Sequence, residues 1–594
     1  MTLVAGIVPR PGGPSIPSEI ERSLIEEISR DPTHAPEVVR RGASLLLKVD
    51  LGAFPSPALI DEPQGPATAV CGEPLLLGQD HRAWRPREVD VAELHRSAAR
   101  GAWLETLPSA TGTFAAAHLS ANGQQLLLAS DSLGVRPLYL WEGHHGVIFS
   151  STLRLLLALP GLRRSLDLLG ALEFAVKRTP LGARTPYREI RRIGPAEVMT
   201  YAADSGAFRI HRYRDLPGGK KAGSGAPDSR EFQRTLLDRF EEAIARRLRG
   251  DQATLAFLSG GMDSRAIVAL LRDLGAEVHT FNFSIPGQQD EVYAREFAKA
   301  VGTLHRTEAR RKPVSLWAGD WSRMLAQAWN DPSRRENPGV ERPRIAWSGD
   351  GGSVSVGGSA AHRDEIALAM SRGNLDEAAR LYLPRLPRRI LRRPVREELE
   401  ALLHEGMVRE LERLAVDDPL RTFHLFLMLN DQRRHLDGHF EEIDRHGLEL
   451  QLPFFDAAFQ SLLAEIPIHA LRKHAFYNAW YDCFPPAVRA VPWQAYPGHR
   501  PCPTPARAQI SDQWSRAGGK GAAVVERAGY RLERRQILEL LHGRGFPSTH
   551  LSRSAVLLAG LLSQLRLRRT GHAVEFAWWM TRVSSGEASG GAWG

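Results

Sequence analysis

The sequence predicts an α/β protein in which an α/β layered first domain precedes a second domain built on a doubly wound parallel sheet. Two observations support this prediction. Over residues 1–215, short apolar or alternating runs are separated by turn residues, which is typical of strands in a layered domain. From residue 231 onward, strand-like and helix-like segments alternate, which is typical of a parallel sheet whose ligands lie at the carboxyl ends of its strands.

The composition indicates a globular protein of two or three domains. The chain has 594 residues, of which 43% are hydrophobic, and this is enough for large cores. Its net charge of +9 comes from arginines in short clusters such as Arg388-Arg389 and Arg392-Arg393. No nucleic-acid recognition motif accompanies this charge, so nucleic acid is not expected as a partner.

The cysteines and the apolar runs bear on the compartment. Cys71, Cys483 and Cys502 are far apart and odd in number, so neither a disulfide framework nor a zinc site is indicated. The best apolar run, residues 555–562, is far shorter than a membrane span, and the sequence does not start with the pattern of a secretion signal. We therefore expect a cytoplasmic protein that does not enter a membrane. Its oligomeric state is open, with a homodimer as one option.

The expected domain boundaries follow from local composition. The first domain covers residues 1–215, with strands expected at 3–8, 43–49, 112–119, 125–129 and 147–149. Residues 216–230 are rich in Gly, Ser, Lys and Pro and are predicted to be a flexible linker. The second domain covers residues 231–505. Residues 506–594 are expected to be a helical extension with a disordered Gly/Ser-rich tail from Ser584 onward.

The stretch ATLAFLSGGMDSRAIVALL, residues 253–271, contains the predicted ligand site. A short buried strand ends at Leu258, the loop Ser259-Gly260-Gly261-Met262-Asp263-Ser264 follows, and a helix begins after Asp263. The two glycines let the backbone bring its N–H groups close to a ligand, and the two serines add hydroxyl groups. A helix N-terminus favours negative charge, so the loop is predicted to hold an anion. A glycine-rich turn without a ligand is the alternative.

Further elements are expected around this loop. They are a charged helix over 231–248, a strand over 277–283, a helix over 290–301 and a strand over 344–347. Asp290 and Glu291 are the first two residues of the helix expected over 290–301. Acids in a first helical turn usually interact with the helix dipole, and a catalytic role is the alternative.

Several motifs carry a resemblance to a known family. Residues 259–264 resemble the SGGxDS loop of ATP pyrophosphatases, and the loop lacks the Lys of the GxxxxGK[ST] nucleotide motif. Residues 112–115, 131–139 and 149–151 look like the GxFAF, RDRxGxKPLYY and FASE blocks of the glutaminase domain in asparagine synthetases, and the domain order is the same. The resemblance implies an N-terminal Ntn-hydrolase-like αββα sandwich and a C-terminal ATP-pyrophosphatase domain with helical additions.

The glutaminase part departs from that family at two positions. The family begins with a nucleophilic Cys in a CGI segment, and here Ala5-Gly6-Ile7 takes its place, without a nucleophile. The family's NGE segment, which holds glutamine, corresponds to Cys71-Gly72-Glu73. We therefore expect glutamine hydrolysis to be lost and the domain to persist as a support or docking surface. An N-terminal Thr2, formed by removal of Met1, is the alternative nucleophile, although it lies three residues before the matching position.

A second glycine-rich loop also resembles the family. Residues 348–358, SGDGGSVSVGG, look like its SGEGxDExFGG loop. Asp350 replaces a Glu of that motif and retains a carboxylate, whereas Ser353 stands where the family has a magnesium-ligating Asp. Mg²⁺ is commonly bound by one or two carboxylates, with phosphate oxygens and water as its other ligands. Asp263 and the oxygens of ATP could therefore still hold one ion. A flexible glycine loop without this role is the alternative.

The resemblance implies roles for particular residues. Ser259, Gly260, Gly261 and Ser264 would hold pyrophosphate, and Asp263 would carry Mg²⁺. Leu258, Phe283, Ser348 and Gly349 would complete the ATP site, and the catalytic candidates are Asp350, Glu449 and Lys473.

Two of these candidates have open alternatives. Glu449 lies in His446-Gly447-Leu448-Glu449, which resembles the family's HGLEARVPFLD segment, and it would either orient the substrate or be a buried structural carboxylate. Lys473 corresponds to a helical Lys of the family. A later loop Lys of the family has no counterpart here, because the matching residues, 491–494, are Val-Pro-Trp-Gln. His435 and His439 are one helical turn apart, and a solvated or core pair is preferred over a metal site.

The implied reaction is ATP-dependent formation of an amide. A carboxylate would attack the α phosphate of ATP, pyrophosphate would leave, and ammonia or an amine would attack the acyl adenylate. The β-lactam synthetases and lasso-peptide cyclases resemble this family and also lack a working glutaminase, so a small molecule or a peptide could supply the carboxylate. A catalytically silent relative that binds nucleotide or a partner enzyme is the other hypothesis.

Overall fold

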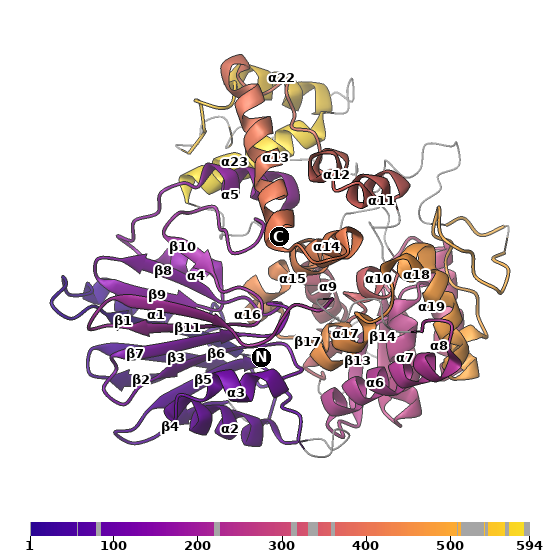
Figure 1. Ribbon diagram of the computed structural model, residues 1–594, viewed down its shortest axis with the longest axis horizontal. Helices are drawn as coiled ribbons and strands as arrows, with labels where there is room; N and C mark the ends of the chain where they lie inside the picture. Colours follow the sequence, from indigo (N-terminus) through magenta and orange to yellow (C-terminus); the bar gives the residue numbers. More distant parts are fainter. Residues whose placement is uncertain are drawn as a thin grey trace.

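A computed structural model of the chain describes residues 2–55, 58–78, 85–218, 226–309, 318–330, 342–357, 363–507, 509–512, 540, 545–564 and 570–586. It shows a mixed α/β protein with antiparallel sheets in the N-terminal part and a parallel sheet in the C-terminal part (Figure 1). Part of the predicted linker, residues 219–225, and the end of the predicted tail, residues 587–594, lie outside the described residues.

Two stacked antiparallel sheets of six strands each form the N-terminal part. Neighbouring strands of the first sheet are, in order, β10 (Ile190–Arg192), β8 (Tyr139–Gly143), β9 (Gly146–Ser150), β1 (Thr2–Pro9), β3 (Ser44–Asp50) and β2 (Glu37–Arg41). Those of the second sheet are β12 (Ala207–Arg212), β11 (Glu197–Ala202), β7 (Gln125–Ser130), β6 (Phe114–Leu119), β5 (Ala67–Gly72) and β4 (Leu59–Asp61). The five strands expected from the sequence are all present, within two residues of their predicted ends.

Helices cover both outer faces of these sheets, which gives four layers. Apolar residues such as Leu46, Leu128 and Phe149 fill the space between the sheets. Helices α1 (Ser18–Glu27) and α4 (Leu153–Ala158) pack on the first sheet. Helices α2 (Arg87–Ala99) and α3 (Trp103–Thr106) cover the second sheet. The central strands of each sheet are therefore buried on both faces and are accordingly rich in apolar residues, whereas β2 and β12 at the edges are largely exposed.

The C-terminal part contains a five-stranded parallel sheet. Its neighbours are, in order, β15 (Leu304–Thr307), β14 (Glu277–Asn282), β13 (Ala253–Phe257), β16 (Ile345–Trp347) and β17 (Glu449–Gln451). Helices α6 (Arg230–Leu248), α7 (Asp263–Asp273) and α8 (Gln289–Val301) pack on one face, and α9 (Ala318–Asn330) and α15 (Gln432–Glu441) pack on the other. The strand order reverses between β13 and β16. In parallel sheets of this kind, ligands bind in the crevice at such a reversal.

One strand of the parallel sheet was not expected from the sequence. Glu449–Gln451 is strand β17, which pairs with β16. Gly447, with a φ of 63°, ends the preceding helix and lets the chain turn into the sheet. A three-residue strand at a sheet edge has too short a pattern to be recognised from sequence.

The remaining described helices are mostly short and lie around the two sheet regions. They are α5 (Leu168–Lys177), α10 (Gly352–Ser355), α11 (Asp364–Ser371), α12 (Leu375–Tyr382), α13 (Arg396–Arg413), α14 (Pro419–Phe426), α16 (Ile443–His446), α17 (Ala457–Leu463), α18 (Ile468–Leu471), α19 (Ala475–Trp480), α22 (Arg553–Gln564) and α23 (Gly571–Ser585).

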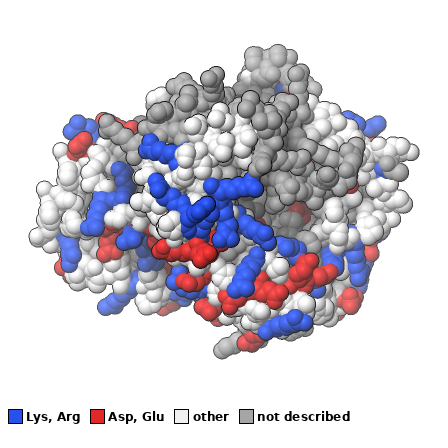
Figure 2. Space-filling model, turned by 90° about the horizontal axis from the view of Figure 1, so that it is seen from above, with Lys and Arg blue, Asp and Glu red and all other residues white. Residues whose placement is uncertain are grey.

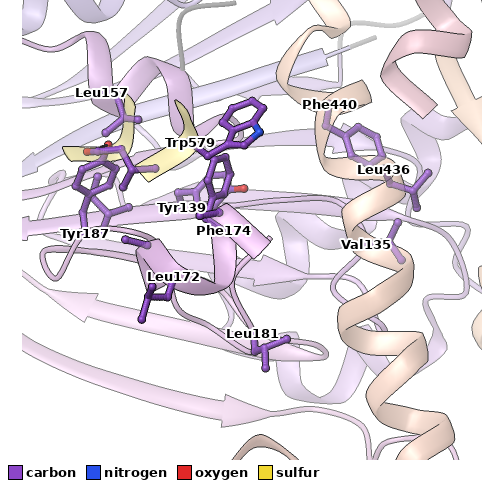
Figure 3. Packing of buried hydrophobic residues seen from close by; sticks show 14 of the residues in the cluster. Val135, Tyr139, Leu157, Leu172, Phe174, Leu181, Tyr187, Leu436, Phe440 and Trp579 are labelled. Atoms are coloured by element: carbon purple, nitrogen blue, oxygen red, sulfur yellow. Dashed lines mark hydrogen bonds between the residues drawn. The ribbon is translucent and has the colours of Figure 1, made fainter. Parts of the chain in front are cut away.

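The C-terminal helix α23 returns to the N-terminal part and packs on α5. Trp579 meets Phe174 edge to face, with ring centroids 5.5 Å apart (Figure 3). The hydroxyl of Tyr187 donates a hydrogen bond of 3.1 Å to the carbonyl of Val583. The last described helix of the chain is therefore packed against the N-terminal part.

Basic side chains gather over the middle of one face of the molecule (Figure 2). Between α12 and α13, the sequence RLPRRILRRPVR, residues 385–396, exposes five arginines and buries Leu386, Ile390 and Leu391. Among the described helices, none combines the length and the apolar composition that crossing a bilayer requires. The three cysteines are free thiols.

Candidate functional site

The two glycine-rich loops meet where the strand order of the parallel sheet reverses. Residues 258–262 follow β13, residues 348–351 follow β16, and these two strands are neighbours. The glycines permit this close approach. A Cβ atom at Gly349 would lie 2.9 Å from Cβ of Asp263, and one at Gly352 would lie 2.5 Å from its Oδ1. Side chains at these two positions would force the loops apart.

Hydrogen bonds inside the first loop fix its shape. The N–H of Ser259 donates to Oγ of Ser264 at 3.0 Å, and the N–H of Gly261 donates to Oγ of Ser259 at 3.1 Å. The N–H of Gly260 donates to Oδ1 of Asp290 at 2.8 Å. An anion seated here would replace the serine hydroxyls as the acceptor for these N–H groups, and the same hydroxyls would then be free to donate to it.

Asp263 begins helix α7 and lies between the two loops. Its Oδ1 accepts a 2.7 Å hydrogen bond from the hydroxyl of Tyr477, and its carboxylate also accepts the backbone N–H of Ser353. Burial raises the pKa of Asp263 to about 7, and the nearby charge of Asp350 adds to this rise, while the Tyr477 hydroxyl opposes it. Two neighbouring acidic groups, one of them with a raised pKa, favour a cation between or beside them.

The oxygen donors at this point fit a magnesium site completed by phosphate. Asp263 and Asp350 are the acidic groups, and Oδ2 of Asp350 accepts a 2.6 Å hydrogen bond from Oγ of Ser348. Within the described ranges, no group of three or more His, Cys, Asp or Glu side chains could hold a metal ion by itself. Mg²⁺ bound by one or two carboxylates usually takes its other ligands from substrate phosphates and water. The site therefore suits a metal–nucleotide complex better than a permanent ion.

The remaining predicted nucleotide residues lie along the same edge of the sheet. The N–H of Leu258 donates to the carbonyl of Phe281 at 2.8 Å, and its carbonyl accepts the side-chain amide of Asn282. Phe283 is buried next to Trp321, with ring centroids 5.6 Å apart. The structure therefore brings Leu258, Phe283, Ser348 and Gly349 to the edge on which Asp263 lies.

Asp290 has a structural partner that the sequence did not reveal. It binds the N–H of Gly260 through Oδ1, and its Oδ2 lies 3.4 Å from the amide nitrogen of Asn282. Glu291 accepts the N–H of Gly287 and pairs with Arg295. These contacts show a role for Asp290 in shaping the glycine loop.

Arg265 connects the glycine loop to a third segment of the site, residues 491–494. Its buried guanidinium donates to the carbonyl of Gly261 at 3.0 Å, and to the carbonyls of Val491 at 2.6 Å and Pro492 at 3.1 Å. This fastens residues 491–494 against the glycine loop. Arg265 directly follows the SGGMDS motif, but no sequence pattern indicated this partner.

Two of the predicted catalytic residues form ion pairs with residues outside the two glycine-rich loops. Glu449 is buried and pairs with Arg136 of the N-terminal part, and the Arg136 guanidinium also lies over the ring of Phe440, 4.6 Å from its centroid. Lys473 is partly exposed and pairs with Asp364 at 2.9 Å. Asp350 is thus the one of the three that the structure brings beside Asp263.

The predicted histidine pair lies on α15. His439 is buried, its Nδ1 lies 2.9 Å from Oγ of Ser322, and its ring stacks on that of His446 at 4.6 Å. Burial lowers the pKa of His439 well below its ordinary value. His435 is partly buried on the same helix.

The positions that would hold glutamine in the resembling family carry other side chains here. Ala5 is buried in β1, and the strand extends beyond it to Thr2, which pairs with Asp50 of β3. Glu73 pairs with Arg249 and accepts a 2.5 Å hydrogen bond from the side-chain amide of Gln451. These contacts engage Glu73 with the parallel-sheet part.

A lysine is buried between the two antiparallel sheets close to this pocket. Nζ of Lys48 has no hydrogen-bond partner among the described residues. The pKa of Lys48 is lowered to about 7, chiefly by burial. Cys71 and Asp50 oppose this shift, and the charge of Arg87 adds to it. Lys48 therefore titrates near neutral pH, well below an ordinary lysine.

Comparisons with known proteins agree with this arrangement. Residues 235–489 match the asparagine synthase family model, and residues 93–214 match the glutamine amidotransferase domain model. Asparagine synthetase [glutamine-hydrolyzing] 3 of Bacillus subtilis is 31% identical over 216 residues, which are 33% of this chain and 34% of that protein. Asparagine synthetase B of Escherichia coli is 24% identical over 215 residues, 34% of this chain and 33% of that protein.

A vertebrate relative extends the match. The asparagine synthetase of Gallus gallus is 23% identical over 378 residues, 62% of this chain and 58% of that protein. Each of these matches thus spans less than two thirds of the relative's own length. A glutamine phosphoribosylpyrophosphate amidotransferase from B. subtilis aligns with a TM-score of 0.26 and 13% identity, covering 52% of this chain and 90% of that one; at this score the likeness carries no argument.

The sheets and the two glycine-rich loops define a two-part α/β protein whose candidate site lies where the strand order of the parallel sheet reverses. Together with the two domain matches, they support a relationship of this chain to the asparagine synthases.

Proposed function

We propose that this chain is an ATP-dependent amide-forming ligase that releases AMP and pyrophosphate. The observation that carries the proposal is the place of Asp263. It lies at the start of a helix beside the glycine loop, and burial, with a smaller contribution from the charge of Asp350, raises its pKa. A carboxylate in such surroundings is stabilised by a cation, and Mg²⁺ bound to the phosphates of ATP is the cation that this donor set fits.

The proposed reaction has two steps. A substrate carboxylate oxygen forms a bond to the α phosphorus, the bond to the β-phosphate oxygen breaks, and pyrophosphate leaves. Ammonia or an amine then attacks the acyl carbon, loses a proton, and AMP leaves. Ser259, Gly260, Gly261 and Ser264 would hold the pyrophosphate through N–H and hydroxyl groups, and Asp263 would hold Mg²⁺.

The three catalytic candidates, Asp350, Glu449 and Lys473, are supported to different degrees. Asp350 is supported by its place beside Asp263. Glu449 and Lys473 would have to leave Arg136 and Asp364 to reach a substrate, and for Glu449 this would expose two buried charges. We therefore favour a structural role for Glu449.

The proposed ligase does not use glutamine as its nitrogen source. Ala5 cannot act as a nucleophile, and Glu73 is engaged by Arg249 and Gln451. Free ammonia or a substrate amine would then supply the nitrogen. We further propose that the carboxylate belongs to a small molecule or a peptide and that the protein acts in the cytoplasm, with a homodimer as one option for its assembly.

ATP–pyrophosphate exchange across a panel of amino acid and peptide carboxylates tests this function. We expect at least one carboxylate to support Mg²⁺-dependent exchange that Asp263→Asn abolishes. Asp273→Asn makes the same change at an exposed position on the same helix and should leave exchange intact. Release of ADP in place of AMP would contradict the proposal. ATP binding without exchange for any carboxylate would favour a silent nucleotide-binding relative.

A further inference from the structure

Helix α15 lies between the N-terminal part and the parallel sheet, and its first residue reaches the second glycine-rich loop (Figure 1). Gln432 is 6% exposed, and its Oε1 accepts a 3.1 Å hydrogen bond from the N–H of Gly351. That N–H belongs to the planar peptide group that also contains the carbonyl of Asp350. The bond therefore fixes the orientation of the backbone next to the Asp350 carboxylate.

The backbone at Gly351 requires such a restraint. Its φ is 92°, in the left-handed region that glycine adopts readily and other residues avoid. Gly352 follows directly, and two consecutive glycines leave the backbone many other conformations. An acceptor outside the loop, bonded to the Gly351 N–H, selects one of them. The side-chain amide of Gln432 thus sets the path of the loop at the residue after Asp350.

The helix that carries Gln432 begins after an irregular turn. Residues Leu427–Asp431 form a π-helical turn between α14 and α15. Such turns are rare and occur frequently at functional sites. The extra residue rotates the side chains that follow it by about 100°, the rotation per residue of an α-helix. The π-helical turn therefore decides whether Gln432 faces Gly351.

Contacts with the N-terminal part hold this turn. Nζ of Lys177, at the end of α5, lies 3.2 Å from Oδ1 of Asp431. The hydroxyl of Tyr382 donates to the same carboxylate, and the side chains of Lys177 and Asp431 are only 8% and 14% exposed. One residue earlier, Oδ1 of Asn430 accepts the N–H of Gly182 at 2.8 Å. The N-terminal part thus binds the last two residues of the turn, directly before α15 begins.

We propose that Lys177 and Gln432 are positioning residues for the magnesium site. Through their contacts, the N-terminal part holds Asp350 beside Asp263. The inference rests on the proposed function, because it explains how one of the two acidic groups of that site is kept in place. It gives the N-terminal part, which has Ala5 at the position of the nucleophile, a role in the ligase reaction.

Hydrogen exchange of the protein without ligands, read by mass spectrometry over residues 348–357, tests the contacts themselves. Gln432→Met keeps the length of the side chain and removes the acceptor, and Lys177→Met removes the ammonium group. We expect each substitution to speed hydrogen exchange in this segment about tenfold, the effect of losing one hydrogen bond. Gln432→Glu keeps an acceptor for the Gly351 N–H, so its segment should exchange more slowly than that of Gln432→Met.

The concentration of free Mg²⁺ that half-saturates ATP–pyrophosphate exchange tests the consequence for the site. Displacement of Asp350 weakens Mg²⁺ binding, so we expect this concentration to rise about tenfold in both methionine variants. Because Lys177 and Gln432 act through the same turn, the double variant should be no worse than the more impaired single variant.

The controls make the same changes at exposed positions. Lys299→Met lies on α8, and Gln252→Met lies before β13. Both should match the wild type in hydrogen exchange of residues 348–357 and in the Mg²⁺ requirement. Thermal unfolding of every variant shows whether the fold is retained.

Failure of this inference differs from failure of the proposed function. Unchanged hydrogen exchange of residues 348–357 in Lys177→Met, or additive effects of the two substitutions, would show that the N-terminal part does not set the loop. Faster hydrogen exchange with an unchanged Mg²⁺ requirement would show that the contacts are structural only, and the inference would again be wrong. If the wild type shows no Mg²⁺-dependent ATP–pyrophosphate exchange, the proposed function is wrong, and hydrogen exchange still decides whether these contacts hold the loop.

Discussion

The hydroxyl of Tyr477 donates a 2.7 Å hydrogen bond to Oδ1 of Asp263. The two residues are 214 positions apart in the chain, and both are placed at the edge of the parallel sheet. This bond favours the ionised carboxylate, whereas burial and the charge of Asp350 favour the protonated form. The pKa of Asp263, about 7, is the balance of these effects.

Ligase activity should therefore rise with pH through neutrality. Mg²⁺ competes with a proton for Asp263, so the apparent affinity for the ion increases as pH rises toward and past 7. Tyr477→Phe removes the bond that lowers the pKa, and we expect the midpoint of the activity profile to move to higher pH. Profiles of Mg²⁺-dependent ATP turnover measure this. Tyr187→Phe, which loses a distant hydroxyl contact to Val583, is the control and should leave the midpoint in place.

The Arg136–Glu449 pair should behave as a structural contact. Both side chains are almost fully buried, at 2% and 3% exposure, so removing one leaves an uncompensated charge. We expect Glu449→Leu to lower the free energy of unfolding by about 3–5 kcal/mol, and the double variant Arg136→Met/Glu449→Leu to recover most of it. Urea unfolding measures the stability. A double variant that is stable yet inactive would instead support a substrate-orienting role for Glu449.

Glutamine should not be hydrolysed by this chain. Pure protein incubated with glutamine should release no glutamate above the buffer background. Ala5→Cys should not restore the activity, because residues 2–4 continue β1 ahead of it and residue 5 therefore has no free amino group to act as base. Glutamate release by the wild type that stops on replacement of Thr2 would show that the N-terminal threonine is the nucleophile.

Lys48 should destabilise the N-terminal part near neutral pH. Its pKa falls from an ordinary 10.5 to about 7 on folding, so the unfolded chain binds more protons between these values, and stability rises with pH across this window. We expect Lys48→Met to raise the free energy of unfolding by at least about 1 kcal/mol at pH 7, with a smaller gain at pH 9.5.

Denaturant unfolding at the two pH values measures this effect. Lys299→Met, at an exposed position on α8, should change little at either pH. A loss of stability in Lys48→Met would mean that the amine has a stabilising partner in solution.

The parts of the site that could be predicted are those encoded in short contiguous segments. The order of strand, glycine loop and helix around residues 253–271 places Ser259 and Asp263 at the carboxyl end of β13, and the structure has them there. Asp350 follows another strand of the same sheet, and parallel strands end at the same edge, so its approach to Asp263 follows from topology.

The parts that escaped prediction depend on contacts between distant segments. Tyr477, Gln494 and Tyr496 come from a helical and loop region without a recognisable pattern, and only the folded chain brings them onto the glycine loop. Arg136 and Glu449 are 313 residues apart, so the sequence left the role of Glu449 open. Strand β17 was missed because three residues give no periodicity.

Calorimetric binding of Mg-ATP to the wild type and to Asp263→Asn tests the central claim most directly. Asn keeps the shape of the side chain and removes the charge, and the raised pKa of Asp263 makes loss of the fold in this variant unexpected. We predict that the wild type binds ATP much more tightly with Mg²⁺ than without it, and that Asp263→Asn weakens Mg-ATP binding by about a hundredfold. Equal binding of ATP with and without Mg²⁺, or equal binding of Mg-ATP by the two proteins, would contradict the assignment of Asp263 as the magnesium ligand.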